Sequence, residues 1–192
     1  MRIFFSMLLC MALLFTAGCA ENTSSTDTID SNETGFLTTP ENLRMAINQQ
    51  GPETVQLPEY EVTDYPEQAT FYSSYVNDNL TFRANLYAET ESSIPVIEIG
   101  YSSMDKAIGD EDLRWMADCM EVIIGLVDPE VDAKETTDAI IAQGAIYSSE
   151  KLFYLYDSYE TETLGYCTTF LATPVEEWIE GYYFNRDVME EW

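Results

Sequence analysis

One long apolar segment constrains the fold more than any other part of this sequence. Residues 109–129, GDEDLRWMADCMEVIIGLVDP, place apolar side chains at the i, i+3, i+4, i+7 spacing of an amphipathic helix. Only Arg114, Asp118 and Glu121 form a polar stripe, which we expect to face solvent. Because so wide an apolar face must be covered on most sides, the segment predicts a long central helix packed on a sheet. The residues expected to be buried are Met116, Met120, Ile123 and Ile124.

The N-terminal residues 1–18 predict a signal peptide. Arg2 precedes an apolar run at 3–15 that is too short to be a permanent membrane span. The run ends in TAGC at 16–19, which resembles the lipobox of bacterial lipoproteins, with Thr at a position where Leu is usual. We therefore expect a lipoprotein with palmitate-type acyl chains on Cys19, anchored at the extracytoplasmic face of the cell membrane. A plain secretory peptide or an uncleaved anchor is the alternative.

Composition divides the remaining chain into a tether and one domain. Residues 19–35 hold Cys19 followed by Ser, Thr, Asn, Asp and Glu with almost nothing that could be buried, which is typical of a flexible tether. Residues 36–192 suit a single α+β domain. The formal net charge of −27 disfavours binding to nucleic acid and to anionic lipid headgroups. Membrane association would therefore depend on the lipid.

The order of the predicted elements indicates hairpins rather than alternating βαβ units. Thr39 caps a helix at 40–50, Asp110 caps the long helix, and Asp132 caps a third helix that ends at Gly144. The candidate strands are 54–61, 69–76, 80–87, 95–102, 151–159 and 163–172, and a partly helical segment at 174–192 closes the chain. This order predicts an antiparallel sheet of five or six strands packed on the central helix. The architecture is similar to helix-grip and TATA-box-binding-protein-like two-layer folds.

The chain as a whole resembles a group of small lipoproteins of Gram-positive bacteria for which no activity is established. The matching features are Cys19, the polar tether, the helix end at Asp128-Pro129 and the capped helix start from Asp132 to Glu135. The resemblance covers most of the chain and implies a membrane-anchored α+β domain without implying an activity. The two cysteines within the domain are not expected in that group.

The absence of histidine removes several classes of catalytic chemistry. Ser-His-Asp and Cys-His catalysis and His-based zinc sites all need an imidazole, and the sequence contains no His. It also contains no GxxxxGK[ST] or GxGxxG phosphate-binding motif. We therefore predict no catalytic residue, no metal site and no cofactor.

Carboxylates are the groups that could still support chemistry. Glu98 lies in an otherwise apolar strand and is the best candidate for the carboxylate pair of a glycan hydrolase, although ordinary alternation would make it an outward-facing polar residue. Acidic clusters at 110–112 and 128–132 contain oxygen ligands that suit Ca²⁺, but helix capping explains both.

Two cysteines and a group of tyrosines are the other candidate site residues. Cys119 and Cys167 are candidates for a disulfide, with two buried free thiols as the alternative. Tyrosines of the terminal hairpin are candidates for contacts with a sugar or peptide, because they combine a flat apolar face with a polar edge, and core packing is the alternative. These residues are Tyr154, Tyr156, Tyr159 and Tyr166.

The sequence thus favours a non-enzymatic binding module of the cell envelope. Its expected partners are the membrane, through the N-terminal lipid, and an envelope protein, a peptide or a glycan. The alternative is a carboxylate-dependent envelope hydrolase that acts on glycans.

Overall fold

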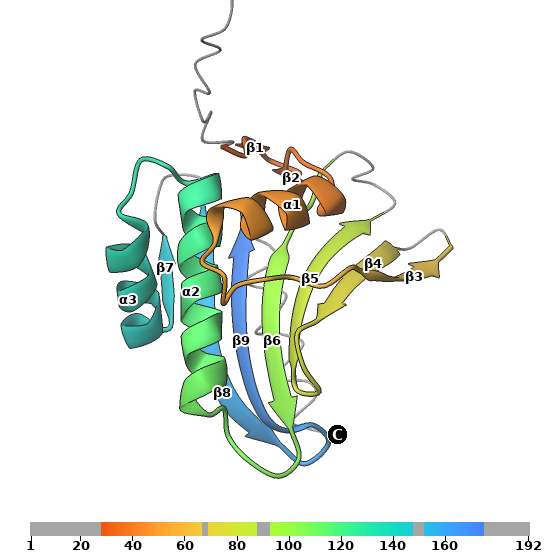
Figure 1. Cartoon of the computed structure of the whole chain (residues 1–192), viewed down its shortest axis with the longest axis vertical. Helices are drawn as coiled ribbons and strands as arrows, with labels where there is room; N and C mark the ends of the chain where they lie inside the picture. Colours follow the sequence, from red (N-terminus) through yellow and green to blue (C-terminus); the bar gives the residue numbers. More distant parts are fainter. Residues whose placement is uncertain (1–27, 67–68, 88–92, 148–151, 175–192) are drawn as a thin grey trace, which may run out of the picture.

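The computed structural model describes residues 28–66, 69–87, 93–147 and 152–174, which form an α+β fold (Figure 1). The helices are α1 (Pro40–Gln50), α2 (Asp110–Val127) and α3 (Ala133–Gln143). The strands are β1 (Ser31–Asn32), β2 (Gly35–Phe36), β3 (Glu61–Tyr65), β4 (Ala69–Tyr75), β5 (Leu80–Tyr87), β6 (Ile97–Ser103), β7 (Ala145–Tyr147), β8 (Phe153–Thr161) and β9 (Gly165–Thr173). The predicted α+β class is confirmed.

The main sheet is antiparallel throughout and has the strand order β3-β4-β5-β6-β9-β8-β7. Both predicted hairpins, β4–β5 and β8–β9, are confirmed. Strand β6 joins them, because it pairs with β5 on one side and with β9 on the other. Strand β3, which begins where the strand predicted at 54–61 was expected to end, and the three-residue β7 were not predicted, and with them the sheet has seven strands where five or six were expected.

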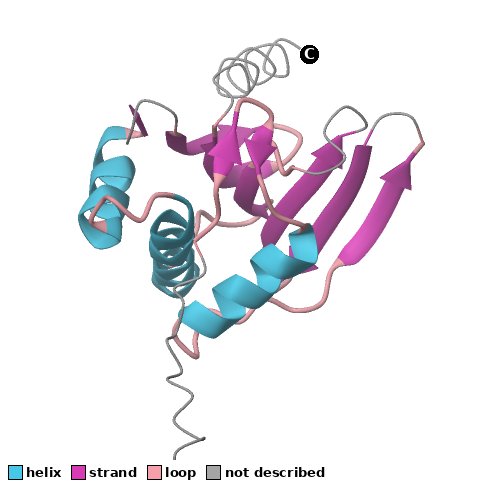
Figure 2. Cartoon of the chain, turned by 90° about the horizontal axis from the view of Figure 1, so that it is seen from above, coloured by secondary structure: helices cyan, strands magenta, loops and turns pink. Residues whose placement is uncertain are grey.

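The pleat gives the sheet two different faces. Figures 1 and 2 show α1 and α2 on the same side of the sheet, which we call the inner face. Side chains that line the inner face are almost completely buried: Leu80, Phe82, Ala84, Ile97, Ile99, Tyr101, Tyr154, Phe170 and Ala172. Because successive side chains of a strand point to opposite sides, their neighbours in sequence lie on the opposite side, the outer face.

Helix α2 supplies much of the core that covers the inner face. The predicted burial of Met116, Met120, Ile123 and Ile124 is confirmed, since none has exposed surface. Glu121 is exposed and Asp118 is partly exposed. The predicted cap is wrong: Gly109 is the N-cap residue without a side-chain cap bond, and Asp110 is already the first helical residue. The acidic first turn still lies at the positive end of the helix dipole, where negative charge is stabilising.

The caps of the other two helices are as predicted. The Thr39 hydroxyl accepts a hydrogen bond from the N–H of Asn42 at 3.2 Å at the start of α1. The Asp132 carboxylate accepts one from the N–H of Glu135 at 2.9 Å at the start of α3, and Gly144 ends that helix. These bonds satisfy N–H groups that have no partner within the helix.

The domain begins earlier than predicted. Ile29 is buried, and its N–H donates to the carbonyl of Leu126 at 2.8 Å. Phe36 is fully buried and exchanges backbone hydrogen bonds with Ile94. Residues 29–35, which the sequence assigned to the tether, are therefore joined to the domain by the buried side chain of Ile29 and by backbone hydrogen bonds. The predicted signal peptide and Cys19 lie outside the described residues.

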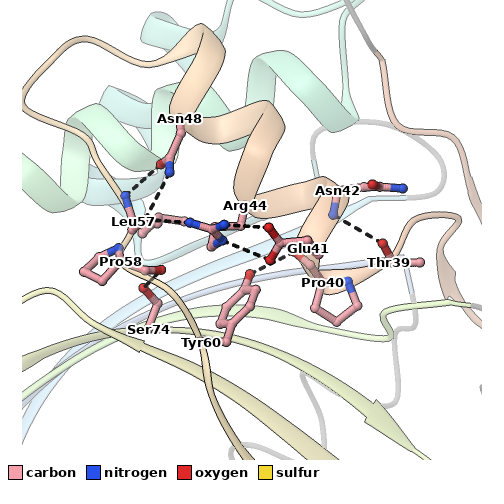
Figure 3. Close-up of polar contacts among 10 residues, drawn as sticks. All are labelled: Thr39, Pro40, Glu41, Asn42, Arg44, Asn48, Leu57, Pro58, Tyr60 and Ser74. Carbon is pink, nitrogen blue, oxygen red and sulfur yellow. Dashed lines mark hydrogen bonds and ion pairs between the residues drawn. The ribbon is translucent and has the colours of Figure 1, made fainter.

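The connection at 51–60, which we call the strap, is not the strand predicted at 54–61. Figure 3 shows how it is held between α1 and the sheet. Asn48 of α1 binds both backbone groups of Leu57: its Nδ2 donates to the carbonyl at 3.0 Å and its Oδ1 accepts from the N–H at 2.7 Å. Ser74 of β4 donates to the carbonyl of Pro58 at 2.8 Å. The backbone groups of Leu57 and Pro58 bond to side chains and not to a neighbouring strand. Because Pro58 also has no N–H to donate to a strand ladder, the segment does not form a strand.

The start of α1 is fastened to the far end of the strap. The Tyr60 hydroxyl donates to the carbonyl of Pro40 at 3.1 Å (Figure 3), and its ring packs edge-on against Tyr72 with centroids 5.7 Å apart. Arg44 pairs with Glu41 through two hydrogen bonds of 2.5 and 3.1 Å. These contacts fix the inner layer over β4 and β5.

Replacing Asn48 with Ala should lower the free energy of unfolding by about 2 kcal/mol, because two hydrogen bonds are lost and a partly buried N–H loses its partner. Urea unfolding of the purified protein measures this. The control is Gln49→Ala at the adjacent exposed position of the same helix, which should change stability by less than about 0.5 kcal/mol. Equal losses in the two variants would contradict the role given to Asn48.

Candidate functional site

The tyrosines of the terminal hairpin do not form one surface. Alternation along β8 and β9 places Tyr154, Tyr156 and Tyr166 on the inner face and Tyr159 on the outer face. Tyr154 is only 1% exposed and stacks on Phe170 with ring centroids 6.2 Å apart. Tyr154 is therefore a core residue, and the other three candidates are partly buried on two different sides of the sheet.

Cys119 and Cys167 are both free and buried, so the candidate disulfide is not formed. Cys119 faces the core from α2, whereas Cys167 alternates with Thr168 and Phe170 on β9 and so lies on the outer face. The sheet separates the two sulfurs. Burial raises the pKa of the Cys119 thiol above its ordinary value of 9.0, and the nearby Asp118 carboxylate adds to the shift.

Glu98 points outward, as ordinary alternation requires. Its Oε1 accepts a hydrogen bond from Nη1 of Arg83 at 2.8 Å, with 22% of the Glu98 side chain and 40% of the Arg83 side chain exposed. The residue therefore faces a cation on the neighbouring strand rather than a second carboxylate. The acidic clusters at 110–112 and 128–132 do not converge either: within the described ranges no group of three or more carboxylate or thiol side chains could hold a metal ion.

The outer face of β3–β6 carries polar and aromatic side chains, of which Glu61, Tyr65 and Tyr75 are exposed, whereas Thr81 and Asn85 are buried. The register aligns Glu61, Ser73, Arg83 and Glu98 in one row across four strands. The next row contains Tyr75, Thr81, Gly100 and Thr169. We call this surface, with Tyr65 and Phe71 beside it, the outer platform.

Gly100 interrupts the platform in the middle of a central strand. A β-carbon there would lie 3.2 Å from Oε1 of Glu98 and 3.8 Å from Nη1 of Arg83. Its cross-strand neighbours are Thr81 and Thr169. Glycine within a strand costs about 0.5–1 kcal/mol relative to Ala, and it often marks a position where a ligand approaches the backbone. Gly100 is therefore a position without a side chain on the outer face, with the buried Thr81 and Thr169 on the neighbouring strands and the ends of Glu98 and Arg83 beside it. We call this position the Gly100 gap.

Aromatic rings lie at both ends of β4 on the same face. Tyr65 and Phe71 meet edge-to-face with centroids 5.3 Å apart. Tyr75 lies four residues further along β4, about 13 Å away at the rise of an extended strand. Tyr65 and Tyr75 are 50% and 51% exposed. Half-exposed rings beside hydrogen-bonding groups are suited to a ligand with apolar faces and polar edges.

The outer face changes character toward the other end of the sheet. Leu155 and Leu171 continue the row of Glu98 on β8 and β9, and both are buried. Cys167 and Thr169 beside them are buried as well. The exposed side chains Glu61, Tyr65 and Tyr75 and the Arg83–Glu98 ion pair all lie on β3–β6, which is why we place the candidate site there.

No protein-family model, no curated protein and no solved structure matches this chain. Within the part of the chain that the structure describes, no helix is both long and apolar enough to cross a membrane. The candidate site therefore rests on the geometry of its own residues.

Sequence reasoning missed the platform although part of its signal was present. The alternation of Thr81, Arg83 and Asn85 with apolar residues indicated a polar face on β5. The sequence did not show which residues of the neighbouring strands lie beside that face. The pairings of Arg83 with Glu98 and of Gly100 with Thr169 depend on strand order and register, which local patterns do not determine.

Tyr154→Phe should leave the free energy of unfolding unchanged or raise it by up to about 1 kcal/mol, because the hydroxyl is buried and has no hydrogen-bond partner in the described part of the structure. Tyr60→Phe is the matched variant, since its buried hydroxyl is bonded to Pro40, and it should cost about 1 kcal/mol. Thermal unfolding of both variants tests this difference. A loss at Tyr154 equal to that at Tyr60 would mean that Tyr154 has a polar partner.

The same pair of variants should change the alkaline limb of the stability curve. Burial raises the pKa of both phenols above the ordinary value of 10.0, so the folded state keeps protons that the unfolded chain releases. The contribution of each protonated phenol to the free energy of unfolding is therefore fully present below pH 10 and is lost as the pH rises above it. Above pH 10, each Phe substitution should make the decrease in the free energy of unfolding smaller by up to about 1.4 kcal/mol per pH unit.

Proposed function

We propose that this protein is a non-enzymatic, lipid-anchored binding module that holds a neutral oligosaccharide on the outer platform. The observation that carries the proposal is the Gly100 gap, a side-chain-free position in a central strand between aromatic rings and hydrogen-bonding groups. Sugars present apolar ring faces and hydroxyl edges, and both kinds of group on the platform complement them. The distance between the Tyr65–Phe71 pair and Tyr75 suits a chain of several sugars rather than a single one.

Charge supports a neutral rather than an anionic ligand. The chain carries 35 Asp and Glu against 8 Lys and Arg, so an anionic polymer would be repelled over long range. The one guanidinium on the platform, Arg83, is already paired with Glu98. Hydroxyl groups can bind to this ion pair as donors and as acceptors without adding charge.

Binding without hydrolysis is favoured by the partner of Glu98. Glycosidases use two carboxyl groups about 5–9.5 Å apart across the scissile bond, whereas Glu98 is held by a guanidinium at 2.8 Å. The absence of His removes the other common hydrolytic arrangements. Release of shortened oligosaccharides during the binding experiment below would favour the hydrolase instead.

The anchor is part of the same proposal. Cys19 carries the lipid and the polar segment after it is the tether, which places the domain on the extracytoplasmic face of the cell membrane, as in the Gram-positive lipoproteins that the chain resembles. Cys19→Ala should move the protein from the membrane fraction to the soluble extracytoplasmic fraction. Retention of that variant in the membrane would refute the lipid anchor.

The finer description of the fold also belongs to this proposal. The wrapping of a long antiparallel sheet around α1 and α2 supports a two-layer architecture of the helix-grip or TATA-box-binding-protein-like kind (Figure 2). In such an arrangement the helices occupy the inner face, which leaves the outer face for a ligand.

Gly100→Ala should weaken oligosaccharide binding by about tenfold, which is 1.4 kcal/mol, because the methyl group fills the gap. The fold should tolerate it, since the nearest atoms are the flexible ends of Glu98 and Arg83 and the residue does not have a positive φ. Isothermal calorimetry with soluble chito-, gluco- and malto-oligosaccharides measures binding. Thermal unfolding of the same samples should show unchanged or slightly raised stability.

The control is Gly125→Ala, a second glycine-to-alanine change, in the helix on the inner side, where the nearest atom is the Ala133 β-carbon at 3.9 Å. It should stabilise the helix by about 0.8–1 kcal/mol and leave binding unchanged. Equal affinity for Gly100→Ala and the unmodified protein, or no binding by any oligosaccharide of the panel, would remove the proposed function.

A further inference from the structure

The edge strand β3 is open along its whole length. It pairs with β4 and lies at the end of the sheet (Figure 1), and all five of its residues are exposed. Val62 and Tyr65 are large apolar residues with 55% and 50% of their surface exposed. Pro58 and Pro66 stand outside the strand, so every residue of β3 retains its N–H.

The ladder determines which backbone groups of β3 face outward. The N–H of Val76 donates to the carbonyl of Leu80 at 2.9 Å, so this opposed pair is a hydrogen-bonded one. Hydrogen-bonded and non-bonded pairs alternate in an antiparallel ladder. The even-numbered residues of β4 therefore bond to β5 and the odd-numbered residues bond to β3.

The same alternation carries over to β3. Glu61, Thr63 and Tyr65 are opposite odd-numbered residues of β4, so their backbone groups point into the sheet. Val62 and Asp64 are left with N–H and C=O groups directed away from it. Strand β3 thus offers two donors and two acceptors, at alternate positions, to any extended chain that lies beside it.

The charge of this edge is of one sign. Glu59, Glu61 and Asp64 are all exposed, and the segment 59–65 contains no Lys or Arg. Exposed carboxylates on a strand edge oppose pairing with a second copy, which would bring the same charges together. They do not oppose a chain of opposite charge, and the −27 net charge of the protein would draw such a chain toward it.

The opposite edge of the sheet, β7, is less suited to pairing with an added strand. Strand β7 has only three residues, and α3 contacts both β7 and β8 beside it. Shortness and a covering helix are two common ways to protect a sheet edge. Of the two edges, β3 alone combines length, exposure and one sign of charge.

We propose that β3 is a docking edge at which an extended, cationic peptide segment of another protein adds as a further antiparallel or parallel strand. The backbone groups of Val62 and Asp64 supply the hydrogen bonds. Lys or Arg side chains at alternate positions of the partner all lie on one side of the sheet, where they face either Glu61 on the outer side or Asp64 on the inner side. Strand addition of this kind takes affinity from the main chain and specificity from alternate side chains. This site is separate from the Gly100 gap and does not depend on the oligosaccharide proposal.

The test uses a synthetic peptide of alternating Lys and Thr as the probe, with the purified full-length protein. A peptide of alternating Glu and Thr controls for charge, and a fully N-methylated Lys-Thr peptide keeps the charge but has no backbone donor. The Lys-Thr peptide should bind at least about tenfold more tightly than either control at low salt. Its affinity should fall as the salt concentration rises, because the paired charges are exposed. Amide hydrogen exchange should slow at Val62 and Asp64 in the complex.

Protein variants separate backbone pairing from charge. Val62→Pro removes an outward N–H at an edge position that tolerates proline, and it should reduce binding about tenfold, while Val62→Thr keeps the N–H and should bind as the unmodified protein does. Glu61→Gln with Asp64→Asn should weaken binding and flatten its salt dependence. Equal binding of the N-methylated peptide would overturn the proposal, because attraction would then be electrostatic only. Self-association that Val62→Pro abolishes would also overturn it, in favour of a second copy as the occupant.

Discussion

The alternation of side chains along the antiparallel ladder is the constraint on which the rest of this structure depends. Burial of Phe82, Ile97 and Ile99 in the core fixes which side of β5 and β6 is the inner face. A slip of one residue would exchange the two faces of a strand and expose the core. Each fully buried side chain of this size contributes about 1.5–3 kcal/mol, so the register is strongly determined. Arg83, Glu98 and Gly100 lie on the outer face as a consequence.

The inner layer needs the strap as well as the long helix. Helix α2 lies toward the β8–β9 part of the sheet (Figure 1), while β4 and β5 are covered by a segment without regular secondary structure that Asn48, Tyr60 and Ser74 hold in place. Helices α1 and α2 both lie on the inner side (Figures 1 and 2). On the outer side Glu61, Tyr65 and Tyr75 are exposed, and all five residues of β3 are exposed at the edge of the sheet.

The helices, the hairpins and the fold class could be predicted from sequence because their signals are local. Thr39 and Asp132 cap helices by contacts within three residues, and Leu80 to Tyr87 alternates within one strand. Long-range features could not be predicted. The pairing of β6 with β9 decides that Cys167 faces away from Cys119, and the strand predicted at 54–61 fails because its hydrogen bonds go to side chains of α1 and β4. Gly100 was not a candidate site residue, because the side chains beside it come from β5 and β9 and are not adjacent to it in sequence.

The central claim is that the two faces of the sheet have separate roles, packing on the inner side and ligand binding on the outer. NMR chemical-shift mapping of backbone amides and aromatic side chains during titration with the tightest-binding oligosaccharide tests it most directly. The account predicts shifts concentrated at Thr81, Gly100 and Thr169 and at the ring protons of Tyr65 and Tyr75, with α1 and α2 unchanged. Shifts concentrated instead at Tyr156 and Tyr166 on the inner face, or spread over the helices, would contradict it.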